Sequence, residues 1–201
     1  MFELNPNLIV KVNKILDKQI FEIENFYLNP DRVRQFAISS KKYTKEDNED
    51  LLAYCVGRRV CEDTLDLGYN LKEVFSNLCN HPDWHIEFNE NHHEYCWSGM
   101  RFIVNVTNNQ EILDNRMDII AHVDGIERKW ACVIYLNTPE ECEGGTGFYS
   151  YVQKFDQIKL EYCSKMKYNK AVLYDANMIH GAIMEKYMFK KCDRLVQVMF
   201  M

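Results

Sequence analysis

The stretch "DIIAHVDGIERKWACVIYLNTPEECEGGTGFY", residues 118–149, joins an apolar run that carries a histidine and an aspartate to a second apolar run and a glycine-rich turn. His122 and Asp124 are two residues apart, and side chains at i and i+2 of a strand project to the same side. Gly125 allows the chain to turn directly after them. One imidazole and one carboxylate can occupy two positions on a metal ion, so the pair predicts part of a metal site whose third ligand lies elsewhere in the chain.

The length and composition of the chain bound its domain organisation. A chain of 201 residues suits one domain, and a hydrophobic fraction of 47% is enough for a sizeable core. Only 8 glycines and 4 prolines argue against long disordered linkers. We expect a single domain over residues 1–201, with an N-terminal strand and helical support region at 1–83 and a β core at 84–201.

The charge and the apolar runs exclude several classes of partner. The net charge is -6, with both signs mixed along the chain, which is unlike the basic footprint of a nucleic-acid binder. No apolar run approaches the roughly 20 residues that span a bilayer, and the N-terminus lacks the apolar core of a signal peptide. None of the 8 cysteines forms a CxxC pair, so a zinc ribbon is not expected. We expect a cytoplasmic protein with mostly reduced thiols and with no membrane or nucleic-acid partner.

The N-terminal part reads as a strand followed by helices. The segment "QIFEIENFYLN", residues 19–29, has the texture of a strand that runs into a turn. A helix is predicted next, with Asn29 as its N-cap, Pro30 at its first position and Asp31 in its first turn. Residues 41–50 are polar and predict a loop. A second helix is predicted over residues 71–80, where apolar residues recur at helical spacing.

After residue 83 the sequence pattern changes to short segments rich in β-branched and aromatic residues. These pieces cover residues 84–88, 99–107, 117–125, 130–137, 145–152, 169–176 and 194–200. Such spacing is typical of a β-sandwich or barrel. Residues 155–167 predict a short helix or a loop between two of the strands. The predicted fold class is therefore α+β, with N-terminal helices packed against an all-β core.

His180 is the candidate for the third metal ligand. It follows an apolar strand and a turn in "NKAVLYDANMIHGA", residues 169–182, whereas His92 and His93 lie in a strongly polar stretch that is typical of solvated histidines. Two histidines and one carboxylate leave open positions on Fe(II), which suits oxygenases that admit O2 and a co-substrate. The usual co-substrate, 2-oxoglutarate, chelates the metal with its keto-acid end.

The far carboxylate of such a co-substrate needs a cation, and arginine fits because it stays charged and presents a planar fork. Arg194 begins the last predicted strand, on the same face as Val196 and Val198. Lys190 and Lys191 lie nearer to His180 in the sequence and are the alternative cations. We prefer Arg194 because the sequence "YMFKK", residues 187–191, is typical of an inserted loop.

These motifs occur in one order along residues 117–201: "HVD", "YLN", "GGTGFY", "AVLYDANMIHGA" and "RLVQV". The ordered set resembles the prolyl-4-hydroxylase-like branch of the Fe(II)/2-oxoglutarate-dependent dioxygenase superfamily. It is most similar to a bacterial and phage family with the pattern H-x-D-G…W…YLN…GGT-x-F-Y. A spacing of 14 residues between His180 and Arg194 departs from many members of the superfamily, which place the basic residue about nine to eleven positions after the histidine.

The resemblance implies a double-stranded β-helix, a jelly-roll or cupin-like barrel with iron near its open end. It implies that His122, Asp124 and His180 bind Fe(II), and that Arg194 and Tyr135 bind the far carboxylate of 2-oxoglutarate. Thr146 would face the same pocket. Gly144, Gly145 and Gly147 would allow unusual backbone angles in the turn between barrel strands.

The implied activity is hydroxylation of a small-molecule or peptidyl substrate, with O2 consumed and succinate and CO2 released. Two alternatives stay open: a non-catalytic jelly-roll binding protein, and a cupin-like metalloprotein that does not use 2-oxoglutarate. The apolar C-terminal strand also allows a homodimer, because such a strand must be covered.

Overall fold

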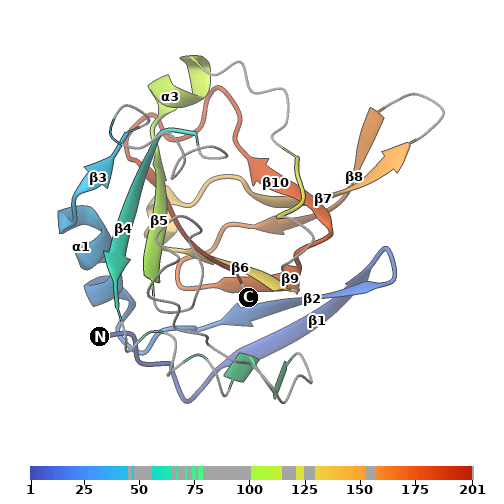
Figure 1. The fold of residues 1–201 in the computed structure, drawn as a ribbon, viewed down its shortest axis with the longest axis horizontal. Coiled ribbons are helices and arrows are strands. Elements are labelled where there is room, and N and C mark those ends of the chain that lie inside the picture. The colour runs from blue at the N-terminus through green and yellow to red at the C-terminus, as the bar shows by residue number, and fades with distance from the viewer. Residues whose placement is uncertain are drawn as a thin grey trace.

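The computed structural model describes residues 1–44, 47, 56–64, 67, 71, 74, 75, 77, 78, 101–114, 121–124, 130–152 and 157–200 (Figure 1). These ranges hold mostly antiparallel β-sheet and few helices. The strands are β1 (Ile9–Ile15), β2 (Lys18–Glu24), β3 (Lys42–Tyr43), β4 (Arg58–Asp63), β5 (Arg101–Thr107), β6 (Trp130–Tyr135), β7 (Gly145–Val152), β8 (Gln157–Lys165), β9 (Ala171–Asp175), β10 (Ile179–Ile183) and β11 (Arg194–Phe200). The helices whose bounds lie within the described residues are α1 (Pro30–Ser39), α3 (Asn109–Asp114) and the 3₁₀ turn η2 (Pro139–Glu141).

The strands form two sheets. The larger sheet has eight strands in the order β1-β2-β9-β6-β11-β5-β4-β3, and the smaller has three in the order β10-β7-β8. Every strand pair within the two sheets is antiparallel. In Figure 1 the β1–β2 and β7–β8 hairpins project on the same side of the molecule, and α1 lies on the opposite side, beside β3 and β4.

The central strands of the larger sheet, β9, β6 and β11, are buried on both faces and carry apolar residues in continuous runs. One face packs against α1 through Val33 and Ala37. The other face packs toward the smaller sheet and contributes Val133, Tyr135 and Tyr174, which meet Phe148 of β7 in one cluster. We call this second cluster the inter-sheet core. Strand alternation sends successive residues of β6, β9 and β11 to the two cores in turn.

Most predicted strands of the β core are confirmed, and β5, β6, β7, β9 and β11 lie within the predicted pieces. Residues 155–167 were a wrong prediction, since β8 occupies most of that segment and pairs with β7. The period-2 placement of Ile158, Leu160 and Tyr162 suits a strand, and pairing with β7 decides the outcome over the local helix-forming residues.

The N-terminal region also differs from the prediction. Besides α1, it contributes β1, β2, β3 and β4 to the larger sheet, so it forms part of the sheet as well as packing on it. The predicted start of α1 is confirmed: Asn29 is the N-cap residue, Pro30 occupies the first turn and Asp31 follows. The Asn29 side chain makes no capping hydrogen bond, however.

Several predictions lie outside the described residues. They include the strand at 84–88, most of the helix at 71–80, the histidines at 92 and 93, Gly125 and the boundary between residues 83 and 84. Within the described part of the chain, no helix combines the length and the apolar character needed to cross a membrane.

Candidate metal centre

The three predicted metal ligands meet because residues 121–124 lie against the start of β10 and the turn that precedes it. His122 and His180 exchange backbone hydrogen bonds, with N···O distances of 2.8 and 2.9 Å, in an isolated β-bridge. The Asp124 N–H donates to the Ala176 carbonyl over 3.0 Å. These three bonds fix the backbone from which the ligand side chains project. Of the strand predicted at 117–125, the described residues form only this bridge.

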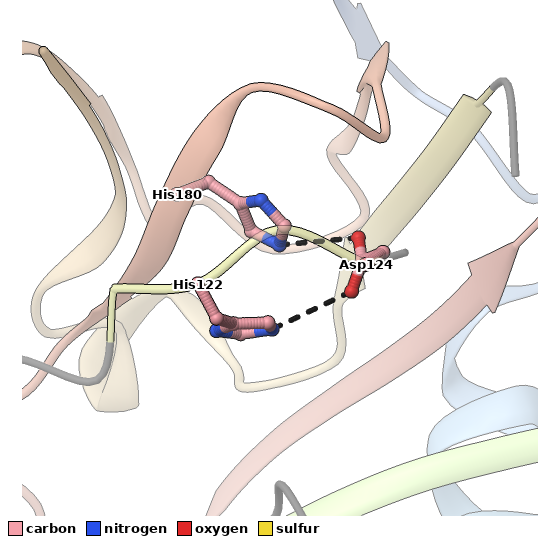
Figure 2. A group of neighbouring side chains, drawn as sticks. All are labelled: His122, Asp124 and His180. Carbon is pink, nitrogen blue, oxygen red and sulfur yellow. Dashed lines mark ion pairs between the residues drawn. The ribbon is translucent and has the colours of Figure 1, made fainter. Parts of the chain in front are cut away.

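The side chains converge on one point (Figure 2). His122 Nε2 lies 3.4 Å from Asp124 Oδ1, and His180 Nε2 lies 3.2 Å from Asp124 Oδ2. One ligand atom from each residue falls within 4.8 Å of the others, which is close enough for all three to bind one metal ion. The His122 side chain is 31% exposed, whereas those of Asp124 and His180 are 4% and 6% exposed. The site therefore opens to solvent on the His122 side.

The orientation of His180 is set by its other ring nitrogen. Nδ1 lies 2.9 Å from the Met178 carbonyl oxygen, which can only accept, so Nδ1 carries the proton. In the neutral imidazole, Nε2 then presents a lone pair toward Asp124. A backbone carbonyl that fixes the tautomer in this way is the usual outer partner of a metal-bound histidine.

Asp124 is a buried carboxylate with an oxygen that lacks a hydrogen-bond partner. Burial, the largest influence, would raise its pKa, but the close approach of the His122 and His180 rings outweighs burial and lowers the pKa to about 2. In the described part of the chain, Oδ2 accepts no hydrogen bond despite its 3.2 Å approach to His180. The Nε2 lone pair of His180 and the Asp124 Oδ2 oxygen repel each other at this distance. The arrangement is stable only when a proton or a cation lies between the two atoms. The donor set therefore fits a divalent metal ion, whose binding would displace such protons.

A second polar group lies deeper in the inter-sheet core. Tyr135 Oη is 2.8 Å from Thr146 Oγ1 and 3.1 Å from the Ser164 carbonyl oxygen. Tyr135 and Thr146 are both buried. Burial raises the Tyr135 pKa well above its usual value, although hydrogen bonds and the charge of Arg194 oppose the shift. The structure therefore brings two of the predicted co-substrate residues, Tyr135 and Thr146, into direct contact.

The three candidate cations differ in burial. Arg194 opens β11 and is 5% exposed, whereas Lys190 and Lys191 are exposed. Arg194 pairs with Thr107 of β5 and lies on the same face of β11 as Val196, which is opposite Tyr135. Of the three, only Arg194 is placed within the protein interior.

The loop that precedes Arg194 closes over the inter-sheet core. Met188 and Phe189 are buried in that core. The Asn109 side chain donates to the Lys186 and Met188 carbonyls over 2.9 and 2.7 Å. These contacts fix the segment that the sequence marked as an inserted loop, and they leave its lysines outside.

The glycines of the "GGTG" turn serve two different purposes. Gly144 has a φ of +68°, and a Cβ there would lie 2.1 Å from the Ile183 carbonyl oxygen. Gly145, with a φ of +159°, is close to extended backbone. Gly147 does not use the freedom that glycine allows, since it is not among the positive-φ residues; a Cβ there would lie 2.5 Å from Tyr149 Oη.

Sequence reasoning missed a buried ion pair near this group. Lys170 Nζ lies 3.0 Å from Glu22 Oε1 and 3.0 Å from Ser164 Oγ, and Ser164 Oγ donates to the same carboxylate over 2.6 Å. The Lys170 ammonium also stands 5.7 Å from the centre of the Tyr135 ring. The available signal was Glu22 itself, a charged residue on the same strand face as Ile20.

Tyr174 was also missed. Its ring centre lies 4.6 Å from that of His180 and 5.1 Å from that of Phe148. Desolvation, followed by the nearby charge of Asp124, raises the Tyr174 pKa well above its usual value. Tyr174 is therefore a neutral phenol packed against His180, a candidate metal ligand.

Comparison with known proteins adds little to this geometry. No family model and no curated protein sequence matches the chain. A solved structure, "IDO from Bacillus thuringiensis", is similar with a TM-score of 0.37 and 8% sequence identity, over 87% of this chain and 99% of that one. A similarity of this degree carries no argument about fold or function.

Proposed function

We propose that this chain is an Fe(II)- and 2-oxoglutarate-dependent oxygenase built on a double-stranded β-helix. The observation that carries the proposal is the convergence of His122, Asp124 and His180, whose ligand atoms lie within 4.8 Å of one another. Two imidazoles and one carboxylate leave open positions for O2 and a co-substrate on Fe(II). The proposed fold is supported by two antiparallel sheets that share one apolar core, with His180 on β10 of the smaller sheet.

The polar group at Tyr135 supports the choice of co-substrate. Thr146 is opposite Ala182, two residues along β10 from His180, so it lies about 7 Å deeper than the metal ligand. We assign the far carboxylate of 2-oxoglutarate to the hydroxyls of Tyr135 and Thr146 and to Arg194. A buried guanidinium supplies a permanent positive charge there, and the hydroxyls supply hydrogen bonds.

On this proposal the protein binds and orients, and the bound iron supplies the activation of O2 that is coupled to conversion of 2-oxoglutarate to succinate and CO2. The Met178 carbonyl holds His180 in the tautomer that leaves Nε2 for the metal. The apolar walls of the inter-sheet core keep water from the co-substrate. The more exposed His122 side faces the approach of a small-molecule or peptidyl substrate. A cytoplasmic location and a homodimer remain part of the proposal.

An anaerobic titration tests the proposal. Fe(II) and then 2-oxoglutarate are added to the metal-free protein, and the visible charge-transfer absorbance of an iron–keto-acid chelate is followed. Asp124→Asn is expected to weaken iron binding by more than about a hundredfold, since even outer partners of metal ligands contribute about 10- to 100-fold. Asp175→Asn is the matched control, because Asp175 pairs with Lys18 at 2.7 Å and is outside the triad.

The outcomes separate the alternatives. Iron binding without the absorbance change on adding 2-oxoglutarate would favour a cupin-like metalloprotein that uses another ligand. A wild-type protein that binds no iron would refute the proposal and favour a non-catalytic jelly-roll binding protein. Equal loss of iron binding in both aspartate variants would show that the effect is not specific to the triad.

A further inference from the structure

Three tyrosines have fully buried rings in the described part of the chain, and two of them have hydrogen-bond partners. Tyr27 donates to Gln197 over 2.9 Å, and Tyr135 bonds to Thr146 and Ser164. The Tyr174 hydroxyl makes no hydrogen bond within the described residues, although the residue is only 1% exposed. The hydroxyl is not among the fully enclosed atoms that lack a partner, so it keeps a small accessible surface that a bound ligand can reach. A hydroxyl so nearly removed from solvent, with no protein partner in the described part of the chain, calls for an explanation.

The position of Tyr174 suggests that explanation. Its ring packs on His180 at 4.6 Å and edge-on against Phe148 at 5.1 Å. Phe148 is the strand partner of His180, so Tyr174 lies at the same level of the inter-sheet core as the metal ligand. The neighbouring charged group is the Asp124 carboxylate. Tyr174 thus stands beside the candidate metal ligands, and Tyr135 is a further electrostatic neighbour of its hydroxyl.

We propose that the Tyr174 hydroxyl donates a hydrogen bond to an anionic oxygen ligand that chelates the metal held by His122, Asp124 and His180. The ligand class is a carboxylate of the kind that the keto-acid end of 2-oxoglutarate presents. The inference rests on the metal site of the proposed function, but it does not require that 2-oxoglutarate be the natural ligand. A phenol suits this task because it remains protonated at neutral pH and can donate to an anion.

Removal of the hydroxyl should affect stability and ligand binding in opposite directions. Tyr174→Phe keeps the ring contacts with His180 and Phe148 and removes only an unpaired polar atom. The metal-free variant should therefore melt at the same temperature as the wild type or higher. The matched control is Tyr27→Phe, which removes a hydrogen bond to Gln197 on the other face of the larger sheet and should lower the melting temperature.

The experiment uses Fe(II)-loaded protein under anaerobic conditions with two probes. Oxalate can chelate the metal but carries no second, distant carboxylate. 2-Oxoglutarate chelates in the same way, and its far carboxylate also reaches the proposed site at Tyr135. Tyr174→Phe should weaken both probes about tenfold, the effect expected of one hydrogen bond to a charged acceptor, and it should shift the charge-transfer absorbance with 2-oxoglutarate. Tyr135→Phe should weaken 2-oxoglutarate alone, and Tyr27→Phe should change neither affinity.

Each outcome decides something distinct. Unchanged oxalate affinity in Tyr174→Phe, with iron binding intact, would overturn the inference. In a second outcome, the wild type binds oxalate more tightly than Tyr174→Phe does and yet fails to bind 2-oxoglutarate. That result would support the inference and refute the proposed co-substrate. A lower melting temperature for metal-free Tyr174→Phe would overturn the inference, because the hydroxyl would then have a structural role. Failure of the wild type to bind iron would overturn both.

Discussion

Protonation of Glu22 should govern the acid stability of this protein. The carboxylate and the Lys170 ammonium form an ion pair at 3.0 Å with side chains that are 10% and 7% exposed. Burial, the largest influence, would raise the Glu22 pKa. Hydrogen bonds from Ser164 and Lys170, the charge of Lys170 and a hydrogen bond from Tyr162 outweigh burial and lower the pKa from 4.5 to about 2.

The size of the effect follows from this shift. A pKa difference of roughly 2.5 units between the unfolded and folded states corresponds to about 3 kcal/mol of unfolding free energy. Because the folded-state pKa is the lower one, this contribution is fully present above the unfolded value of 4.5. It is lost as the pH falls from 4.5 toward about 2, where the folded protein also takes up the proton.

Urea unfolding of the wild type and of Glu22→Gln, repeated across this pH range, measures the contribution. At neutral pH the variant leaves the Lys170 ammonium buried without its counter-charge, so it should be less stable by about 3 to 5 kcal/mol. The difference between the two proteins should shrink by about 3 kcal/mol between about pH 6 and about pH 2. Glu24→Gln is the control, since Glu24 pairs with Lys167 on the surface and such pairs contribute up to about 1 kcal/mol.

A constant difference between wild type and Glu22→Gln over the whole range would refute the reasoning. It would mean that the Glu22 carboxyl titrates alike in the folded and unfolded protein. A similar pH-dependent loss in Glu24→Gln would also refute it, because the effect would then come from general surface charge. Asp124, whose pKa is also lowered to about 2, is present in all three proteins, so its contribution cancels in the comparison.

Two further predictions concern the turn before β7 and the cation of the inner pocket. Gly144→Ala should lower the unfolding free energy by at least about 2 kcal/mol. The alanine would have to adopt a left-handed φ of +68°, and its Cβ would lie 2.1 Å from the Ile183 carbonyl oxygen. A melting temperature equal to that of the wild type would contradict this prediction. Arg194→Met should weaken 2-oxoglutarate binding to the iron-loaded protein by about tenfold or more, whereas Lys190→Met should leave it unchanged. The reverse order in calorimetric titrations would assign the exposed loop, rather than β11, to the co-substrate.

The metal ligands could be predicted from the sequence because their signal is local. His122 and Asp124 are two residues apart, and His180 follows a strand and a turn that are each recognisable from short patterns. The burial of Arg194 likewise follows from its place at the start of a strand that carries a nearly continuous apolar run. Each of these inferences needed only a short stretch of sequence.

The Glu22–Lys170 pair could not be predicted in the same way. The two residues are 148 positions apart, and the hydrogen bond from Ser164 to Glu22 spans 142 positions. Only the order of the sheets brings β2 beside β9 and across from β8. Nothing local distinguishes Lys170 from the exposed Lys167, because burial of a charge depends on a partner that the segment itself does not contain.

For the segment at residues 155–167, the local sequence pattern predicted the wrong secondary structure. Its lysines and glutamate favour a helix locally, yet β8 forms because β7 offers a complete edge for pairing. The register of the pair also shifts between Phe148 and Tyr149, which breaks the regular alternation there. Local pattern alone therefore does not determine the structure of this segment.

The pairing of β7 with β10 also sets the length of ligand that the proposed site can hold. His180 is opposite Phe148, and Ala182 is opposite Thr146, so the metal end and the hydroxyl pair at Tyr135 and Thr146 are separated by two residues of strand. Two residues of strand measure about 7 Å, which a short diacid can bridge and a monoacid cannot. A register slip of one residue would send Thr146 to the opposite face and remove one hydroxyl from the pocket. The selection of a diacid in the proposed function therefore depends on the strand register fixed beside the "GGTG" turn, as much as on the chemistry of Arg194.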